Sequence, residues 1–132
     1  MFKIHKDFKK TSIFIANLNL SELRLMNNQF FPWFVLIPKR KVKEIDELEK
    51  VDQLDLLDEI NLISKLIKNY FNSESLNIAK LGNITSQLHI HIAGRSKNDI
   101  VWPKLIWTAP IKKYSKKNLN KIIKYFKNYF KS

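Results

Sequence analysis

The chain has no cysteine, only two glycines and only four prolines among its 132 residues. The absence of cysteine excludes a disulfide-stabilised scaffold and thiol chemistry, and it fits a reducing compartment. A secretory signal peptide needs a continuous apolar stretch near the N-terminus, and residues 1–7 contain none. No apolar run approaches the length that spans a bilayer. We therefore expect a soluble cytoplasmic protein without a membrane span.

Acidic residues are also scarce, since 12 of them face 24 lysines and arginines and leave a net charge of +12. Eight of these acidic residues lie between Glu44 and Glu59, so both ends of the chain are strongly basic. A cationic surface attracts polyanions whatever their sequence, which keeps a polyanion-associated protein as one alternative. The same positive charge could equally serve to attract a small phosphorylated substrate. We expect no specific nucleic-acid partner.

The hydrophobic content of 45% predicts a packed globule, and the length fits a single domain over residues 1–132. Alternating or wholly apolar patterns predict five strands, over residues 12–20, 22–27, 33–38, 76–81 and 87–93. Helical spacing predicts a long central helix over residues 51–71 and a basic amphipathic C-terminal helix over about 115–131. The first three strands resemble an antiparallel meander. The predicted fold class is α+β, with a five-stranded antiparallel meander sheet.

The central helix has a predicted buried face and a predicted solvated face. Spacings of three or four residues assign the buried face to Leu54, Leu57, Ile60, Ile63, Ile67 and Tyr70. Asp52 is placed to cap the N-terminus, and the acidic residues of the first turns complement the helix dipole. We interpret the acidic run as solvated, rather than as a metal or substrate site.

Two histidines separated by one residue are the most informative feature of the chain. On a strand, Gln87, His89 and His91 share one face and alternate with apolar residues on the other. Three interpretations remain open at this point. In the first, the pair is simply part of the polar face of a half-exposed sheet. In the second, it supplies two ligands to a metal ion, and in the third, it forms a reaction platform of titratable imidazoles. A metal site has little support because there is no cysteine and the third histidine, His5, is distant in sequence.

The sequence around the pair resembles the signature of the histidine triad (HIT) superfamily, His-φ-His-φ-His-φ-φ, where φ is apolar. It reads Gln87-Leu88-His89-Ile90-His91-Ile92-Ala93, with glutamine in place of the first histidine. Further blocks are similar to a bacterial HIT-like subgroup: Leu25-Met26-Asn27 with Pro32-Trp33, Leu81-Gly82-Asn83, and Trp102-Pro103. The resemblance covers roughly residues 12–107.

This resemblance implies a nucleotide hydrolase or transferase that acts at the α-phosphate of a nucleoside phosphate derivative. His89 would be the nucleophile of a nucleotidyl-histidine intermediate and would face an open nucleotide cavity. His91 would bind phosphoryl oxygens or assist the leaving group. Gln87 would support the nucleophile, but an amide cannot titrate. A catalytically weak nucleotide sensor on the same scaffold therefore stays open as an alternative.

The resemblance also implies substrate-binding residues and a partner. The candidates for substrate binding are Asn27, Trp33, Phe34, Asn83, Arg95 and Trp102. Trp102 and Trp107 lie in a segment that approaches the neighbouring subunit in related dimers, so a homodimer is expected. No protein-bound metal or cofactor is required.

Overall fold

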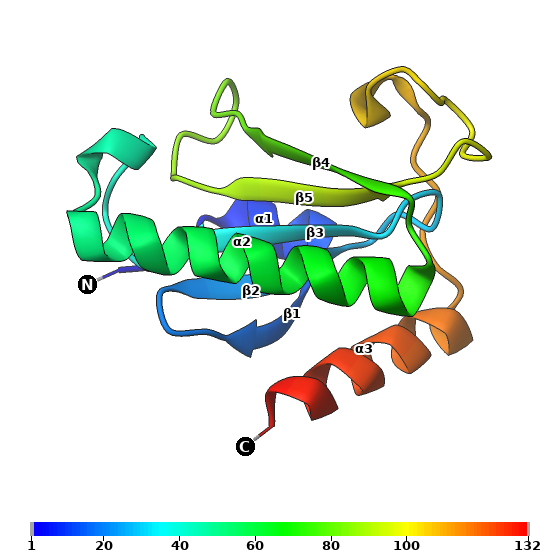
Figure 1. Ribbon diagram of the computed structural model, residues 1–132, viewed down its shortest axis with the longest axis horizontal. Coiled ribbons are helices and arrows are strands. Elements are labelled where there is room, and N and C mark those ends of the chain that lie inside the picture. The colour runs from blue at the N-terminus through cyan, green and yellow to red at the C-terminus, as the bar shows by residue number, and fades with distance from the viewer. Residues whose placement is uncertain (1, 132) are drawn as a thin grey trace.

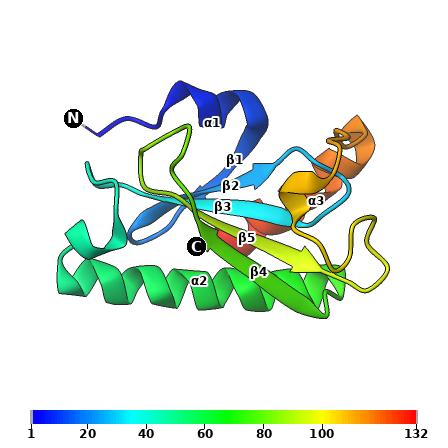
Figure 2. The same ribbon diagram turned by 90° about the horizontal axis from the view of Figure 1, so that it is seen from above.

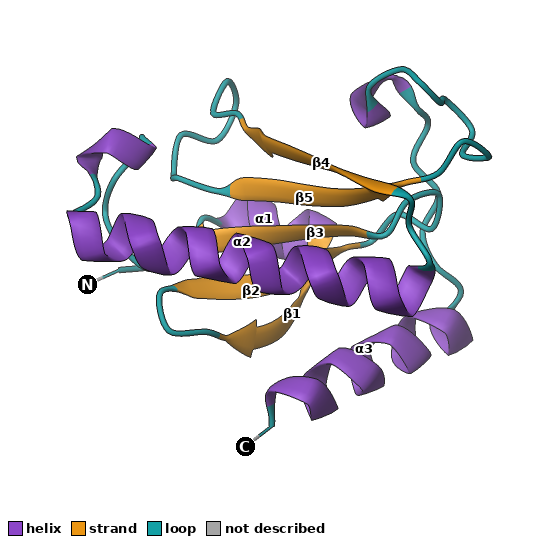
Figure 3. Cartoon of the chain, in the orientation of Figure 1, coloured by secondary structure: helices purple, strands orange, loops and turns teal. Residues whose placement is uncertain are grey.

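The computed structural model describes residues 2–131 and contains a five-stranded antiparallel sheet with helices on both faces (Figures 1 and 3). The strands are β1 (Ser12–Asn17), β2 (Ser21–Met26), β3 (Trp33–Pro38), β4 (Ser75–Lys80) and β5 (Ile90–Arg95). The α-helices are α1 (Lys6–Thr11), α2 (Lys50–Phe71) and α3 (Lys116–Phe130). Short 3₁₀ turns cover Ile45–Glu47 and Ile106–Thr108. The α+β class and the antiparallel sheet predicted from the sequence are confirmed.

The strand order, β1-β2-β3-β5-β4, places β5, the strand that contains His91, inside the sheet. The first three strands follow one another as predicted, but β5 pairs with β3 and leaves β4 at the edge, so the sheet is not a simple meander. In the β3–β5 register, Val35 lies opposite His91 and Trp33 lies opposite Ala93. The apolar strand β3 therefore supplies the neighbours of the histidine pair.

Residues 88–92 alternate between the two faces of the sheet, as the sequence pattern predicts. Leu88, Ile90 and Ile92 are buried in the main core, which lies against α2 and α3. Figure 2 shows α1 on the opposite face of the sheet. Phe8 of α1 packs against His89 there. The strand itself begins at Ile90, three residues later than predicted, and continues to Arg95.

Gly94 brings β5 close to its neighbours on the α2 face. A Cβ at this position would overlap Ser73 Oγ and would lie 2.8 Å from both Ile67 Cγ2 and Pro32 Cγ. The Gly94 N–H also donates to the Pro32 carbonyl at 2.8 Å. Only glycine fits this approach.

The buried face of α2 differs from the prediction. Leu54 and Leu57 are 56% and 55% exposed, whereas Leu56 and Leu66 are buried together with the correctly predicted Ile63 and Ile67. Apolar residues occur on several sides of this helix, so more than one stripe with helical spacing can be drawn through it. The sheet and α3 determine which stripe is buried.

The acidic run at the start of α2 is not simply a solvated face. The helix begins at Lys50, and Asp52 lies in the first turn, where it forms an ion pair with Arg40 rather than an N-cap. Glu59 is buried, and its Oε2 accepts the Leu20 N–H at 2.7 Å. Burial raises the pKa of Glu59 despite this hydrogen bond. Glu59 and Asp52 have these partners because α2 packs next to the β1–β2 turn, which contains Leu20, and next to the segment after β3, which contains Arg40.

The two other helices cover different parts of the sheet. The short helix α1 was not predicted, and its Phe8 packs with Val35 and Ile37 of β3. The C-terminal helix was predicted, and it packs its buried Ile122 and Phe126 into the main core. Within residues 2–131, no helix is both long and apolar enough to cross a membrane.

Candidate active site

His89 and His91 lie side by side on the α1 face of the sheet. Their ring centroids are 5.0 Å apart and the rings are nearly perpendicular. Both residues are buried, with 6% and 8% of their surfaces exposed. The sequence prediction that the two imidazoles share one face is therefore correct.

The environment of His89 determines which ring nitrogen carries its proton. Nδ1 lies 2.7 Å from the Gln87 carbonyl oxygen, which can only accept a hydrogen bond. In the neutral ring Nδ1 therefore carries the proton and Nε2 keeps its lone pair. Burial lowers the pKa of His89, opposed by its hydrogen bond to Gln87, and the charge of Lys80 lowers it further. The ring is thus neutral at pH 7 and carries a nucleophilic nitrogen.

His91 has the opposite tautomer. The indole N–H of Trp33 donates to His91 Nδ1 at 2.9 Å, and an indole nitrogen can only donate. In the neutral ring Nε2 therefore carries the proton. Burial, followed by the neighbouring His89, lowers the pKa of His91 to about 4. At neutral pH the pair combines one imidazole lone pair with one imidazole N–H donor, which suits attack on phosphorus beside a phosphoryl oxygen.

Aromatic side chains cover both rings. Phe8 of α1 packs edge-on against His89, with centroids 4.8 Å apart. Trp107 packs against His91 at 5.3 Å and against Trp33 at 5.4 Å. His89 is 6% exposed, so it does not face the open nucleotide cavity that was expected. α1, which the sequence did not reveal, places Phe8 against the ring.

A cavity lined in part by Trp33, which donates to His91, contains two of the predicted substrate-binding residues, Asn27 and Trp33. This Trp33 cavity has a volume of about 240 Å³ and is lined by Lys10, Thr11, Met26, Asn27, Asn28, Trp33, Ile111 and Lys113. Asn27 Oδ1 accepts the backbone N–H of Tyr114 at 3.0 Å, so this side chain also anchors the segment before α3. The cavity lies beside the indole that holds His91.

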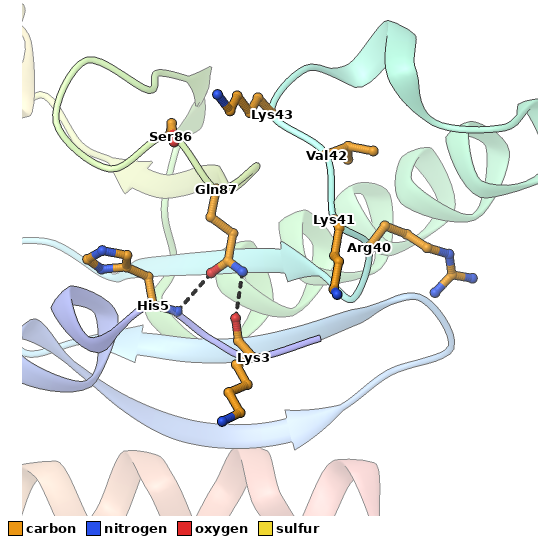
Figure 4. A pocket seen from close by; sticks show the side chains of 8 residues that line it. All are labelled: Lys3, His5, Arg40, Lys41, Val42, Lys43, Ser86 and Gln87. Atoms are coloured by element: carbon orange, nitrogen blue, oxygen red, sulfur yellow. Dashed lines mark hydrogen bonds between the residues drawn. The ribbon is translucent and has the colours of Figure 1, made fainter. Parts of the chain in front are cut away.

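Gln87 does not lie beside the imidazoles as predicted. Its side chain turns toward the N-terminal segment, where Nε2 donates to the Lys3 carbonyl at 2.7 Å and Oε1 accepts the His5 N–H at 2.9 Å (Figure 4). The hydrogen bond between Gln87 and the nucleophile candidate is made by the Gln87 backbone carbonyl. The side chain therefore ties residues 3–5 to the histidine strand, which holds α1 near His89. These contacts join residues more than 80 positions apart, so no local sequence signal reveals them.

The other predicted substrate-binding residues lie outside the site or serve the fold. Phe34 is fully buried on the opposite face of the sheet, against Phe71 and Phe126, and is not a pocket wall. Asn83 is exposed on the β4–β5 loop. Arg95 is buried and forms a two-pronged ion pair with Asp99, so it is not a loop arginine available to phosphate. Trp102 packs on the Arg95 guanidinium.

The third histidine has a structural role. His5 Nδ1 accepts the Asp7 N–H at 3.1 Å and so caps α1. Among residues 2–131, no three histidine or carboxylate side chains are grouped so that they could hold a metal ion.

The match to a family model decides the identity of this fold and site. The HIT domain model matches residues 7–98, which is most of the chain. The chain belongs to the histidine triad (HIT) family. It is therefore a HIT protein with glutamine in the first position of the triad.

Solved structures agree with this assignment. A histidine triad protein of Bradyrhizobium japonicum is 31% identical, with a TM-score of 0.92 over 96% of each chain. A histidine triad protein of Sinorhizobium meliloti is 32% identical, with a TM-score of 0.91 over 96% of each chain. A Plasmodium falciparum diadenosine triphosphate hydrolase is 22% identical, with a TM-score of 0.61 over 92% of this chain and 76% of that one, and shares the fold. No curated protein matches the chain.

Proposed function

We propose that this HIT protein hydrolyses or transfers nucleotidyl groups through a covalent intermediate on His89. His89 Nε2 attacks the α-phosphorus of a nucleoside phosphate derivative, such as a dinucleoside polyphosphate, a nucleoside phosphoramidate or an adenylylated metabolite. An N–P bond forms while the bond from phosphorus to the leaving group breaks. Water or another acceptor then displaces His89 from phosphorus. Two displacements at phosphorus thus replace a single displacement that is more difficult.

The observation that carries this proposal is the complementary pair of tautomers. The Gln87 carbonyl leaves the lone pair of His89 on Nε2, and the Trp33 indole leaves the proton of His91 on Nε2. A nucleophile and a hydrogen-bond donor to a phosphoryl or leaving-group oxygen thus lie on neighbouring rings. A donor or acid placed in this way typically contributes about 10²–10⁴ in rate.

The Trp33 cavity is the proposed nucleoside site. It combines apolar walls, from Met26, Trp33 and Ile111, with polar groups that include Asn27 and Thr11. Pockets for small ligands commonly have this composition. The family membership and the diadenosine triphosphate hydrolase among the structural neighbours support a nucleotide substrate.

The test is direct trapping of the intermediate. The protein is mixed with nucleotides labelled at the α-phosphate, quenched in base and digested, and the adduct is located by mass spectrometry. We expect an acid-labile nucleotidyl adduct on His89. Its yield should stay level below the pH at which a free imidazole becomes protonated, and fall only in more acidic buffer, because burial lowers the pKa of both histidines.

The proposal fails if turnover proceeds with no adduct on His89 in rapid-quench samples. An adduct on His91 would reverse the assigned roles. Labelled inorganic phosphate serves as the control, since it carries no nucleoside and should leave no nucleotidyl adduct.

A nucleotide sensor is the second candidate function, and the buried histidine pair favours it. Phe8 and Trp107 cover both rings, and the Gln87 side chain is engaged by the N-terminal segment. A wild-type protein that binds nucleotides but turns over none of the three substrate classes would support the sensor.

We also propose that the protein is a homodimer. Val51, Leu54 and Leu57 on α2 are each more than half exposed, and Ile78 is exposed on the edge strand β4. Exposed apolar side chains and an unpaired strand edge each favour association with a second copy. Light scattering should give about twice the 15.7 kDa chain mass, and Leu54→Glu/Leu57→Glu should reduce it to one chain. A wild-type protein at one chain mass would contradict the proposal.

A further inference from the structure

A recess on the far side of the histidine pair from the Trp33 cavity is strongly basic. This Gln87 recess has a volume of about 290 Å³ and is lined by Lys3, His5, Arg40, Lys41, Val42, Lys43, Ser86 and Gln87 (Figure 4). Four of these residues are lysine or arginine and none is acidic. The positive charge gathers here from the N-terminal segment and from the segment after β3.

Most of this charge is not neutralised by nearby carboxylates. Arg40 pairs with Asp52 at 2.8 Å, and Figure 4 shows its guanidinium turned away from Gln87. Within residues 2–131, the ammonium groups of Lys3, Lys41 and Lys43 form no ion pair. Glu47 accepts the backbone N–H of Lys43, at 2.8 Å, but does not line the recess.

The walls of the recess are fixed by the backbone. The Leu88 N–H donates to the Val42 carbonyl at 3.1 Å, which joins the lysine-bearing segment to the histidine strand. The Gln87 amide joins the opposite wall, residues 3–5, to the same strand. The recess is therefore a feature of the folded chain and is not formed only by long surface side chains.

We propose that the Gln87 recess binds a compact anion with two or more phosphate-type charges, such as a pyrophosphoryl group. Lysine ammonium groups act as point charges and lack the planar fork with which arginine selects carboxylates, so this site favours charge density over a particular shape. Gln87 lies two residues before His89, and its carbonyl oxygen is 2.7 Å from His89 Nδ1, so the recess borders the candidate nucleophile. The anion is either free pyrophosphate or, if the proposed function holds, the phosphate chain of the nucleotide substrate.

Binding of inorganic pyrophosphate, measured by calorimetry and by amide NMR shifts, tests the recess itself. Lys41→Ala/Lys43→Ala should weaken the affinity by about tenfold or more, because both cations lie well within one Debye length of the anion. The control variant Lys121→Ala/Lys124→Ala removes the same amount of charge from the exposed face of α3. It should change the pyrophosphate affinity by less than about twofold. NMR shifts should centre on residues 41–43 and 87.

Two results would overturn the proposal. One is the absence of saturable pyrophosphate binding to the wild-type protein. The other is an equal loss of affinity in the α3 control, which would assign the binding to the overall charge of the chain.

His89→Ala separates this proposal from the proposed function. Pyrophosphate affinity should be unchanged in this variant, and loss of binding would move the anion to the imidazole and overturn the recess as a site.

Competition identifies the source of the anion. Displacement of pyrophosphate by a nucleotide with a long phosphate chain, but not by a nucleoside monophosphate, assigns the recess to the substrate. Simultaneous binding of pyrophosphate and the long-chain nucleotide assigns it to a separate anion.

Discussion

The His89→Ala variant is expected to lose nucleotide turnover by about 10⁴-fold or more, while its affinity for a non-hydrolysable nucleotide changes by less than about threefold. The imidazole would take part in bond formation, whereas the nucleoside would be held mainly by the Trp33 cavity. Steady-state kinetics and calorimetry measure the two quantities separately. Because Phe8 packs on this ring, alanine also leaves a gap, so His89→Gln is the companion variant that preserves bulk.

The His89→Gln variant should unfold at a midpoint close to that of the wild type if the role of His89 is chemical. A fall in turnover that only matches a fall in the folded fraction would mean that the ring serves packing instead. Turnover within tenfold of the wild-type value in the well-folded His89→Gln variant would remove His89 as the nucleophile.

The Arg95→Met variant is expected to lose about 3–5 kcal/mol of unfolding free energy, the usual cost of breaking a buried ion pair. Arg95 is 2% exposed, and it donates to both Asp99 oxygens at 2.7 and 3.2 Å and to Asn77 at 2.7 Å. Although burial raises the pKa of Asp99, hydrogen bonds from Arg95 and from the backbone lower it overall. Without the guanidinium, Asp99 would stay buried beside an apolar side chain. Urea unfolding measures the loss.

The Arg40–Asp52 pair provides the matched control, since it has the same two-pronged geometry but a 46% exposed arginine. Arg40→Met should lose less than Arg95→Met, because the Arg40 guanidinium is already partly solvated, although its partner Asp52 is buried. Adding Asp99→Asn to Arg95→Met should recover part of the stability. An Arg95→Met loss no larger than that of Arg40→Met would show that the buried pair contributes little.

Much of the fold could be predicted because its signals are local. The apolar run of β3 gave that strand with its observed bounds, and the alternation around His89 gave the two faces of the strand that carries it. The existence of α2 followed from helical spacing. The identity of its buried face did not, because apolar residues on several sides fit that spacing equally well and packing against the sheet and α3 made the choice.

The candidate site was harder to predict, because its contacts join distant parts of the chain. His89, His91 and Trp33 were found from the motif, but Phe8 reaches His89 through a six-residue helix too short to show a periodic pattern. Arg95 was assigned to a phosphate although Asp99, four residues later, is its partner, and that spacing was a signal present in the sequence.

The glutamine in the first triad position makes the attachment of residues 3–5 independent of acidity. Its amide donates to one backbone group of that segment and accepts from another, and neither hydrogen bond needs a titratable proton. A histidine offering the same two contacts would lose its acceptor on protonation. Burial lowers the pKa of both imidazoles, so only strong acidification charges them, and these two hydrogen bonds to the N-terminal segment do not depend on that change.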